Sequence, residues 1–231
     1  MDFSGRHVVV TGGTGALGTA VVADLLTAGA TCTVPYVHEA EAQSFPSRGD
    51  PNVTLIAVSD LADETQVARV YEGLKPWASI HIAGGFAAGK VTETDKKALM
   101  AQIDGNLASC FLCCRAAAKV MLASGGGRIV NVAARPALEW RSGAGMTAYT
   151  VAKAGVAALT VALAEEVAKD GILVNAVAPS IMDTPANRKA MPKANFEAWP
   201  KVDEVAATIL FLASPDNRVT RGAIVPVYGK S

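Results

Sequence analysis

Tyr149 and Lys153 are the residues of this sequence whose types and spacing most directly suggest chemistry. Side chains four residues apart on an α-helix project from the same face, one turn from each other. A phenol ordinarily holds its proton to about pH 10, and a neighbouring ammonium stabilises the phenolate and lowers that pKa. The pair is therefore a candidate proton donor and acceptor near neutral pH, provided that the chain places a reactant beside it.

A glycine-rich stretch near the start of the chain is the best candidate to hold that reactant. Residues 12–18 read GGTGALG, so that Gly13, Gly15 and Gly18 have the spacing Gly-x-Gly-x-x-Gly, directly after the apolar run 6–11. Such glycines let the backbone approach a pyrophosphate, which the free N–H groups at the start of the next helix bind. The stretch predicts a dinucleotide site; the alternative is a glycine-rich turn without a ligand.

The end of the second predicted strand normally decides between NAD and NADP, and here its sequence gives no clear answer. Residues 34–39 read VPYVHE, with Tyr36 where an acidic residue would bind the adenosine ribose and repel a 2′-phosphate. No arginine stands there either, and His38 is interpreted as a solvated loop residue. The choice between NAD(H) and NADP(H) therefore stays open.

The elements that must position these residues alternate along the chain. Apolar runs typical of buried strands lie at 6–11, 30–34, 53–58, 79–83, 128–132, 172–177 and 223–227. Helical patterns follow the glycine-rich stretch and occupy 63–73, 92–123, 149–169 and 202–213, whereas 185–200 is predicted to be irregular. This alternation predicts an α/β fold of the Rossmann type, a doubly wound, seven-stranded parallel sheet with helices on both faces. We expect a single NAD(P)-binding domain over residues 1–231.

Composition narrows the possible functions. The chain has 231 residues, of which 51% are hydrophobic, with 21 basic and 21 acidic residues. Without a basic surface, neither nucleic acid nor an anionic membrane is an expected partner. No apolar run is expected to reach membrane-spanning length, and no secretory signal is evident at the N-terminus. We therefore expect a cytoplasmic protein that acts on a small molecule.

Three of the four cysteines, Cys110, Cys113 and Cys114, fall on one predicted helix. Their spacing forms no disulfide pattern. A C-x-x-C on a helix without a second pair of ligands is also poor spacing for zinc. We interpret the three as buried packing or part of a subunit interface, and we expect no metal.

Several motifs together resemble those of the short-chain dehydrogenase/reductase family. They are the loop 11–18, Asp60, Ala83-Gly84-Gly85, Asn106, the Tyr149 and Lys153 pair, and the stretch 179–184. Their order and spacing agree with that family over nearly the whole chain. The resemblance implies an NAD(P)H-dependent oxidoreductase in which nicotinamide supplies a hydride and Tyr149 supplies a proton.

The resemblance also implies the roles of individual residues. Tyr149, Lys153 and Asn106 would be catalytic: Lys153 would bind the nicotinamide ribose and lower the pKa of Tyr149, and Asn106 would stabilise a helix kink and a proton-relay water. Asp60 would contact the adenine. The full set of implied cofactor-binding residues is Gly12, Thr14, Gly15, Ala16, Leu17, Gly18, Tyr36, Asp60, Leu61, Ala83, Gly84, Gly85, Tyr149, Lys153, Pro179, Ser180, Ile181 and Thr184.

Three positions depart from the family pattern, and one of them bears on the substrate. Ala134 stands where the family usually has a serine whose hydroxyl polarises the substrate oxygen. His81 replaces an asparagine inside an apolar run and is interpreted as a packed strand residue, and Ser180 replaces a glycine. Because stabilising developing negative charge is often the largest catalytic effect, a chain without the serine favours a substrate that is already electrophilic.

Other segments resemble the dihydropteridine reductase branch of the family, which also lacks the serine. These segments are 82–86, 134–138, 145–149 and 183–192, together with Phe196 and Trp199. The resemblance implies a quinonoid dihydropterin as substrate and a substrate lid at about 185–200. Candidate substrate contacts are Ala134, Trp140, Met191, Phe196 and Trp199. Met191, Phe196 and Trp199 could instead anchor the segment to the core.

Two other functions stay open. One is a generic carbonyl reductase or alcohol dehydrogenase acting on a small ketone or hydroxyl substrate; the other is a non-catalytic dinucleotide-binding protein. The helices that carry Asn106 and Tyr149 are apolar around most of their circumference. Since the family packs these helices against a second copy, we expect a homodimer or homotetramer.

Overall fold

Seven parallel strands form one sheet at the centre of the molecule, which is described for all 231 residues by a computed structural model. The strands are β1 His7–Thr11, β2 Thr31–Tyr36, β3 Val53–Ala57, β4 Ala78–His81, β5 Gly127–Val132, β6 Ile172–Pro179 and β7 Ile224–Val227. Their order is β3-β2-β1-β4-β5-β6-β7, and every pairing is parallel. The order reverses between β1 and β4, which makes a crevice at the carboxyl ends of these strands. The predicted doubly wound fold is confirmed.

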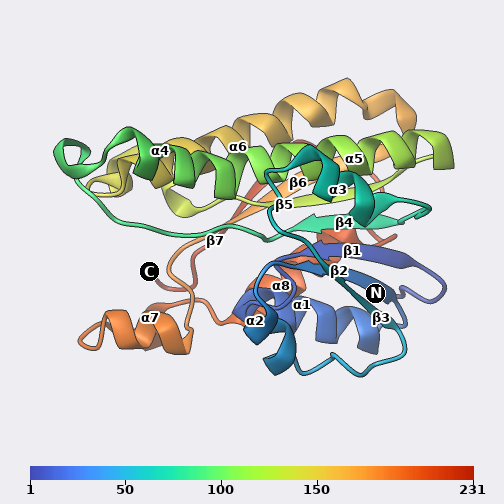
Figure 1. Cartoon of the computed structure of the whole chain (residues 1–231), viewed down its shortest axis with the longest axis horizontal. Helices are drawn as coiled ribbons and strands as arrows, with labels where there is room; N and C mark the ends of the chain where they lie inside the picture. The colour runs from blue at the N-terminus through green and yellow to red at the C-terminus, as the bar shows by residue number, and fades with distance from the viewer.

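Helices cover both faces of this sheet (Figure 1). They are α1 Ala16–Thr27, α2 Glu39–Ser44, α3 Glu64–Tyr71, α4 Lys96–Gln102, α5 Ser109–Ser124, α6 Thr147–Glu166, α7 Pro185–Ala190 and α8 Val202–Ala213. α1 and α8 pack on one face, and α3, α5 and α6 pack on the other. Each face of the sheet buries its own hydrophobic cluster. Because the strands are covered on both sides, their sequences are continuous apolar runs.

The helix predicted at 92–123 is interrupted twice. A 3₁₀ turn at Val91–Glu93 precedes α4, whose first turn is capped by the Asp95 carboxylate, which accepts a hydrogen bond from the backbone N–H of Ala98 at 2.8 Å. A π-helical turn at Ile103–Ala108 then separates α4 from α5. Helical periodicity alone does not reveal this wider turn, which contains Asn106 and its hydrogen bonds to the loop after β4.

The segment 185–200, which was predicted to be irregular, contains the helix α7. Thr184 caps α7 by accepting a hydrogen bond from the backbone N–H of Asn187 at 3.2 Å, and Pro185 occupies the first helical position. Threonine at the N-cap followed by proline is a helix-start signal, so this element could have been predicted. A 3₁₀ turn at Phe196–Ala198 follows.

Two helical stretches, Lys96–Ser124 and Thr147–Glu166, are long and apolar enough to cross a membrane by length and composition alone. The expectation that no stretch would reach this length was therefore wrong. A core helix of a soluble protein passes the same test, and both stretches here pack against the sheet, with 39% and 28% of their apolar windows buried. Apolar residues on their outer side, such as Phe111 and Val151, are exposed.

Candidate active site

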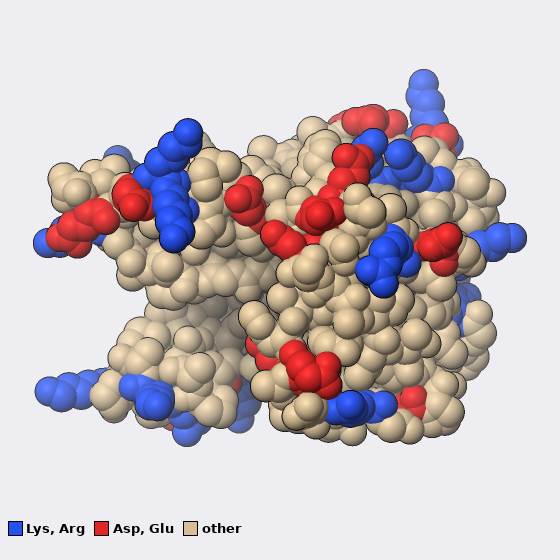
Figure 2. Space-filling view, in the orientation of Figure 1, with Lys and Arg blue, Asp and Glu red and all other residues tan.

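A cavity of about 660 Å³ lies at the carboxyl ends of the central strands. One wall comes from α6 and the loop after β4, and the opposite wall comes from the end of β6 and α7. Figure 2 shows the corresponding hollow between the part of the molecule that carries α4 and the part that carries α7. The cavity is therefore at the crevice that the strand order predicts.

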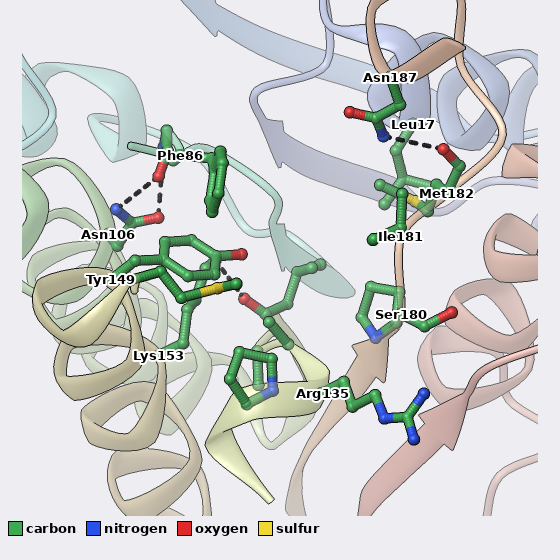
Figure 3. A pocket seen from close by; sticks show the side chains of 18 of the residues that line it. Leu17, Phe86, Asn106, Arg135, Tyr149, Lys153, Ser180, Ile181, Met182 and Asn187 are labelled. Carbon is green, nitrogen blue, oxygen red and sulfur yellow. Dashed lines mark hydrogen bonds between the residues drawn. The ribbon is translucent and has the colours of Figure 1, made fainter. Parts of the chain in front are cut away.

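Tyr149 lies in the first turn of α6 and points into this cavity (Figure 3). Its ring meets that of Phe86 edge-on, with centroids 5.1 Å apart and planes at 85°. Burial raises the pKa of Tyr149 to about 12. The phenol therefore keeps its proton at neutral pH, which suits a proton donor.

Lys153 lies one turn further along α6, and its Nζ donates a hydrogen bond to the backbone oxygen of Val132 at 2.7 Å. Burial lowers the pKa of Lys153 to about 8, and the nearby Cys110 thiol partly opposes that shift. The Nζ is 6.0 Å from the centroid of the Tyr149 ring. Burial determines the pKa of Tyr149 in this structure, and its lowering by Lys153, which the resemblance implies, stays a prediction.

Asn106 fixes the loop after β4 against the π-helical turn. Its Nδ2 donates to the backbone oxygens of Gly85 and Gln102 at 2.9 and 3.0 Å, and the N–H of Gly85 donates to its Oδ1 at 3.3 Å. A Cβ at Gly84 would lie 2.5 Å from that Oδ1, so the close approach requires a glycine. Asn106 also borders the cavity and thereby joins its floor to the helix.

The glycine-rich loop fits a pyrophosphate. A Cβ at Gly18 would lie 2.1 Å from the Gly12 oxygen, so the loop and α1 are in direct backbone contact. A Cβ at Gly15 would instead meet only that same oxygen, at 3.5 Å, and otherwise face open space. Gly15 offers no capping side chain, and the first turn of α1 has no acidic residue. The N–H groups there are thus free to bind phosphate oxygens.

The predicted cofactor residues divide into two groups. Those that line the cavity are Leu17, Gly84, Gly85, Tyr149, Lys153, Pro179, Ser180 and Ile181. Those outside its lining are Gly12, Thr14, Gly15, Ala16, Gly18, Tyr36, Asp60, Leu61, Ala83 and Thr184. Most of the second group lie in the glycine-rich loop and at the ends of β2, β3 and β4, whereas Thr184 is the cap of α7. The Asp60 carboxylate accepts a hydrogen bond from the Ala62 N–H at 2.8 Å.

The predicted substrate residues are also divided. Ala134 and Met191 line the cavity, but Trp140, Phe196 and Trp199 do not. Trp140 is 74% exposed and donates its indole N–H to the Ala137 oxygen. The rings of Phe196 and Trp199 pack against each other with centroids 5.0 Å apart, outside the cavity lining. Their position agrees with the alternative that they anchor the segment.

Several cavity residues were not predicted as site residues. Ser142 lies in the lining, and its hydroxyl donates to the Glu139 oxygen at 2.7 Å. Arg135 borders the far end from Tyr149 and is paired with the Glu139 carboxylate at 2.7 Å. The sequence offers Ser142 as a hydroxyl near Tyr149, but its spacing is wrong for the usual role of the family serine. Nothing in the local sequence marks Ser231, which reaches the lining from the other end of the chain.

A second buried group lies between β4 and α5. His81 Nδ1 donates a hydrogen bond to the Asn131 side-chain oxygen, and its Nε2 is hydrogen-bonded to the Ser79 hydroxyl, both at 2.8 Å. These contacts confirm that His81 is a packed strand residue. Cys110, Cys113 and Cys114 are all free and buried. The ligand atoms of His81, Cys110 and Cys114 lie within 4.8 Å of one another, a grouping that the sequence did not predict because it joins two distant elements.

Comparisons with known proteins agree with this geometry. A family model described as short chain dehydrogenase matches residues 6–195. Galactitol 2-dehydrogenase of Rhizobium johnstonii is 36% identical over 244 residues, covering 96% of this chain and 93% of the relative. Cis-4-hydroxycyclohexanecarboxylate dehydrogenase of Sinomonas cyclohexanicum is 34% identical over 242 residues, covering 98% of this chain and 96% of the relative.

Solved structures have the same architecture. ElxO with NADP bound superposes with a TM-score of 0.86 at 26% identity, covering 97% of each chain. Levodione reductase superposes with a TM-score of 0.88 at 25% identity, covering 98% of this chain and 97% of that one. The likeness in both cases extends over the sheet and the helices that form the cavity.

Proposed function

The chain belongs to the short-chain dehydrogenase/reductase family, and from that premise we propose that it reduces an electron-poor ring of the quinonoid dihydropterin class. As a member of this family it is an NAD(P)-dependent oxidoreductase. The observation that carries the substrate proposal is Ala134. Its methyl group lines the cavity where the family usually offers a serine hydroxyl.

The residues on the two walls of the cavity would have separate tasks in this reaction. A bound nicotinamide supplies the hydride. Tyr149 would donate its phenolic proton to the substrate. Its raised pKa keeps the phenol protonated at neutral pH and therefore ready to donate. Lys153 is held one turn below by the Val132 oxygen, which places its ammonium to bind ribose hydroxyls. Leu17 and Ile181 would flank the cofactor from the loop after β1 and the end of β6.

The character of the cavity supports a flat and already activated substrate. Phe86, Met146, Met182 and Met191 give it largely apolar walls suited to an aromatic ring system. Without a hydroxyl at Ala134, negative charge that develops on a ketone oxygen would lack one stabilising hydrogen bond. A quinonoid ring spreads that charge over several atoms and depends less on such a donor.

Ser142 favours a second candidate, reduction of a small ketone or oxidation of the corresponding alcohol. Its side chain belongs to the cavity lining, although its hydroxyl now donates to the Glu139 oxygen. This candidate requires the hydroxyl to exchange the Glu139 oxygen for a substrate oxygen. Under this candidate Ser142 would take the role that Ala134 cannot fill. A non-catalytic dinucleotide-binding protein is disfavoured by the retention of Tyr149 and Lys153.

Turnover assays with two variants distinguish these candidates. Purified protein is supplied with NADH or NADPH and either a quinonoid dihydropterin or a panel of small ketones. The pterin proposal predicts turnover with the pterin, little effect of Ser142→Ala, and new ketone activity in Ala134→Ser. Ketone turnover in the wild type that is lost in Ser142→Ala would instead establish the second candidate. Absence of turnover with every substrate, despite cofactor binding, would contradict both.

We also propose that residues 1–231 form one NAD(P)-binding domain, with 185–200 as a substrate lid, which acts in the cytoplasm as a homodimer or homotetramer. Four free, buried thiols suit a reducing compartment. The exposed apolar residues of α5 and α6, including Phe111 and Val161, suit a face covered by a second copy. A monomeric mass by light scattering at micromolar concentration would contradict the assembly.

A further inference from the structure

Two carboxylates lie beside the glycine-rich loop, even though β2 itself ends without an acidic residue. Glu39 and Glu41 both belong to the first turn of α2, which begins three residues after Tyr36. The Tyr36 hydroxyl donates to Glu39 Oε2 at 3.0 Å. The Thr14 hydroxyl donates to Glu41 Oε2 at 3.1 Å. One carboxylate is thus held at the tip of β2 and the other at the loop.

These contacts place α2 next to the start of α1, as Figure 1 also shows. In dinucleotide-binding folds the adenosine ribose lies between the tip of the second strand and the glycine-rich loop, and an acidic residue there binds its 2′-hydroxyl. Glu41 contacts the loop through Thr14, and Glu39 contacts the strand tip through Tyr36. The two carboxylates therefore flank the place where the 2′-position would lie.

We propose that Glu41, assisted by Glu39, makes the enzyme select NAD(H) and reject NADP(H). This inference rests on the proposed function, since it concerns the cofactor of the same reaction. Glu41 accepts the Thr14 hydrogen bond with one oxygen, which leaves its other oxygen to accept a hydrogen bond from a ribose hydroxyl. A 2′-phosphate would place further negative charge against both carboxylates.

The positive groups nearby do not compensate for that repulsion. Arg48 is the cation that faces this pair, and it lies 3.7 Å from Glu39 with half of its side chain exposed. His38 is an exposed residue at the start of α2. Neither forms a hydrogen bond with Thr14 or Tyr36. Figure 2 shows acidic side chains over α2 with a basic one beside them. Two carboxylates thus outnumber the one guanidinium.

Direct binding measurements test the proposal without any substrate. NADH and NADPH, which differ only in the 2′-phosphate, are titrated into the protein, and their nicotinamide fluorescence gives the Kd of each. The proteins are wild type, Glu41→Gln, the double variant Glu39→Gln/Glu41→Gln, and Glu166→Gln. The last removes one negative charge from an exposed position at the far end of α6 and is the matched control.

The wild type is expected to bind NADH at least about tenfold more tightly than NADPH, since like-charge contacts cost a few kcal/mol. Glu41→Gln should raise the affinity for NADPH, the double variant should raise it by about tenfold, and the control should leave the ratio unchanged. Thermal melting verifies that each variant is folded.

Equal or tighter binding of NADPH by the wild type would overturn the proposal, and so would an unchanged ratio in the double variant. Such an outcome would leave the reductase function intact if the protein still turned over its substrate. Conversely, selective NADH binding without pterin turnover would contradict the substrate proposal alone. Failure to bind either nucleotide would overturn both.

Discussion

The molecule buries two groups of polar side chains close to each other. Tyr149 and Lys153 lie in the first turns of α6, whereas His81, Cys110 and Cys114 lie between β4 and α5. Each group contains two side chains with strongly shifted pKa values. Burial raises the pKa of Tyr149 and lowers that of Lys153. A hydrogen bond with Cys114 lowers the pKa of Cys110, while burial raises that of Cys114.

The two groups differ in what they face. Tyr149 and Lys153 border a cavity of about 660 Å³. The ring nitrogens of His81 instead face Ser79 and Asn131, and no residue of that group lines the cavity. A shifted pKa thus marks burial in both groups, but only access to a ligand can turn it into catalysis. Substitutions in the first group should change turnover, whereas substitutions in the second should change stability alone.

The largest effect that separates the two groups is expected from Tyr149→Phe. Removal of the phenolic proton should lower kcat by about a thousandfold, because general acid catalysis typically contributes factors of this order. The affinity for NADH and the melting temperature should stay close to those of the wild type. Stopped-flow turnover, fluorescence titration and calorimetry measure the three quantities. Retention of full activity would show that the proton comes from another group.

The next effect concerns the stability cost of keeping Lys153 buried. Its pKa falls from 10.5 to about 8 on folding, so between these pH values the unfolded chain binds a proton that the folded chain does not. Stability relative to Lys153→Met should therefore rise with pH across this window, by up to about 3 kcal/mol at about 1.4 kcal/mol per pKa unit. Urea denaturation of both proteins at pH 7 and pH 10 measures the change. A pH-independent difference would mean that the folded protein does not lower this pKa.

A smaller effect, on stability, is expected from His81→Ala in the second group. The substitution removes the imidazole hydrogen bonds of Ser79 and Asn131, which are buried and keep their bonds to Tyr71 and Cys114. The loss of two buried hydrogen bonds should cost roughly 2 kcal/mol in total and appear as a lower melting temperature. Turnover measured well below that temperature should be unchanged. A fall in kcat at unchanged stability would show that the second group also acts in turnover.

The smallest effect is expected from Tyr71→Phe, which is the matched control for Tyr149→Phe. Tyr71 is also buried, but its hydroxyl bonds to Ser79 at 2.8 Å and lies away from the cavity. Tyr71→Phe should destabilise the protein by about 1 kcal/mol, the usual net value of one hydrogen bond, with no change in kcat. Urea denaturation and turnover assays on this variant and Tyr149→Phe should give opposite patterns. Similar patterns would mean that burial alone determines both phenotypes.

Features that depend on neighbouring residues were accessible from the sequence. The spacing of Tyr149 and Lys153 and the glycine-rich loop are local, and so is the cap at Asp63, whose carboxylate accepts hydrogen bonds from the Thr65 and Gln66 N–H groups at 2.7 and 3.1 Å. The alternation of strands and helices sufficed to predict the sheet.

Features that arise from contacts between distant segments were not accessible. The carboxylate of Glu41 reaches the loop only because α2 folds back over it, and Ser231 reaches the cavity from the end of the chain. The direction of the Tyr149 pKa shift also depended on burial, which the spacing to Lys153 does not reveal. The sequence also left the roles of Phe196 and Trp199 open, because an aromatic pair in a loop can face either a ligand or the protein.

The π-helical turn at Ile103–Ala108 lies between α4 and α5 and holds Asn106 at the cavity. The number of residues in this turn therefore matters for the site. A π-turn closes its hydrogen bonds one residue later than an α-turn, so it accommodates extra chain within the same path. Deleting a single residue there would let an α-helix run through with its two ends still facing the same way, and it would remove the widened turn that carries Asn106. Asn106 would then lose its bonds with the Gly85 backbone, although no cavity residue had been substituted. Among relatives, insertions and deletions should therefore be tolerated less in this stretch than substitutions on its outer side.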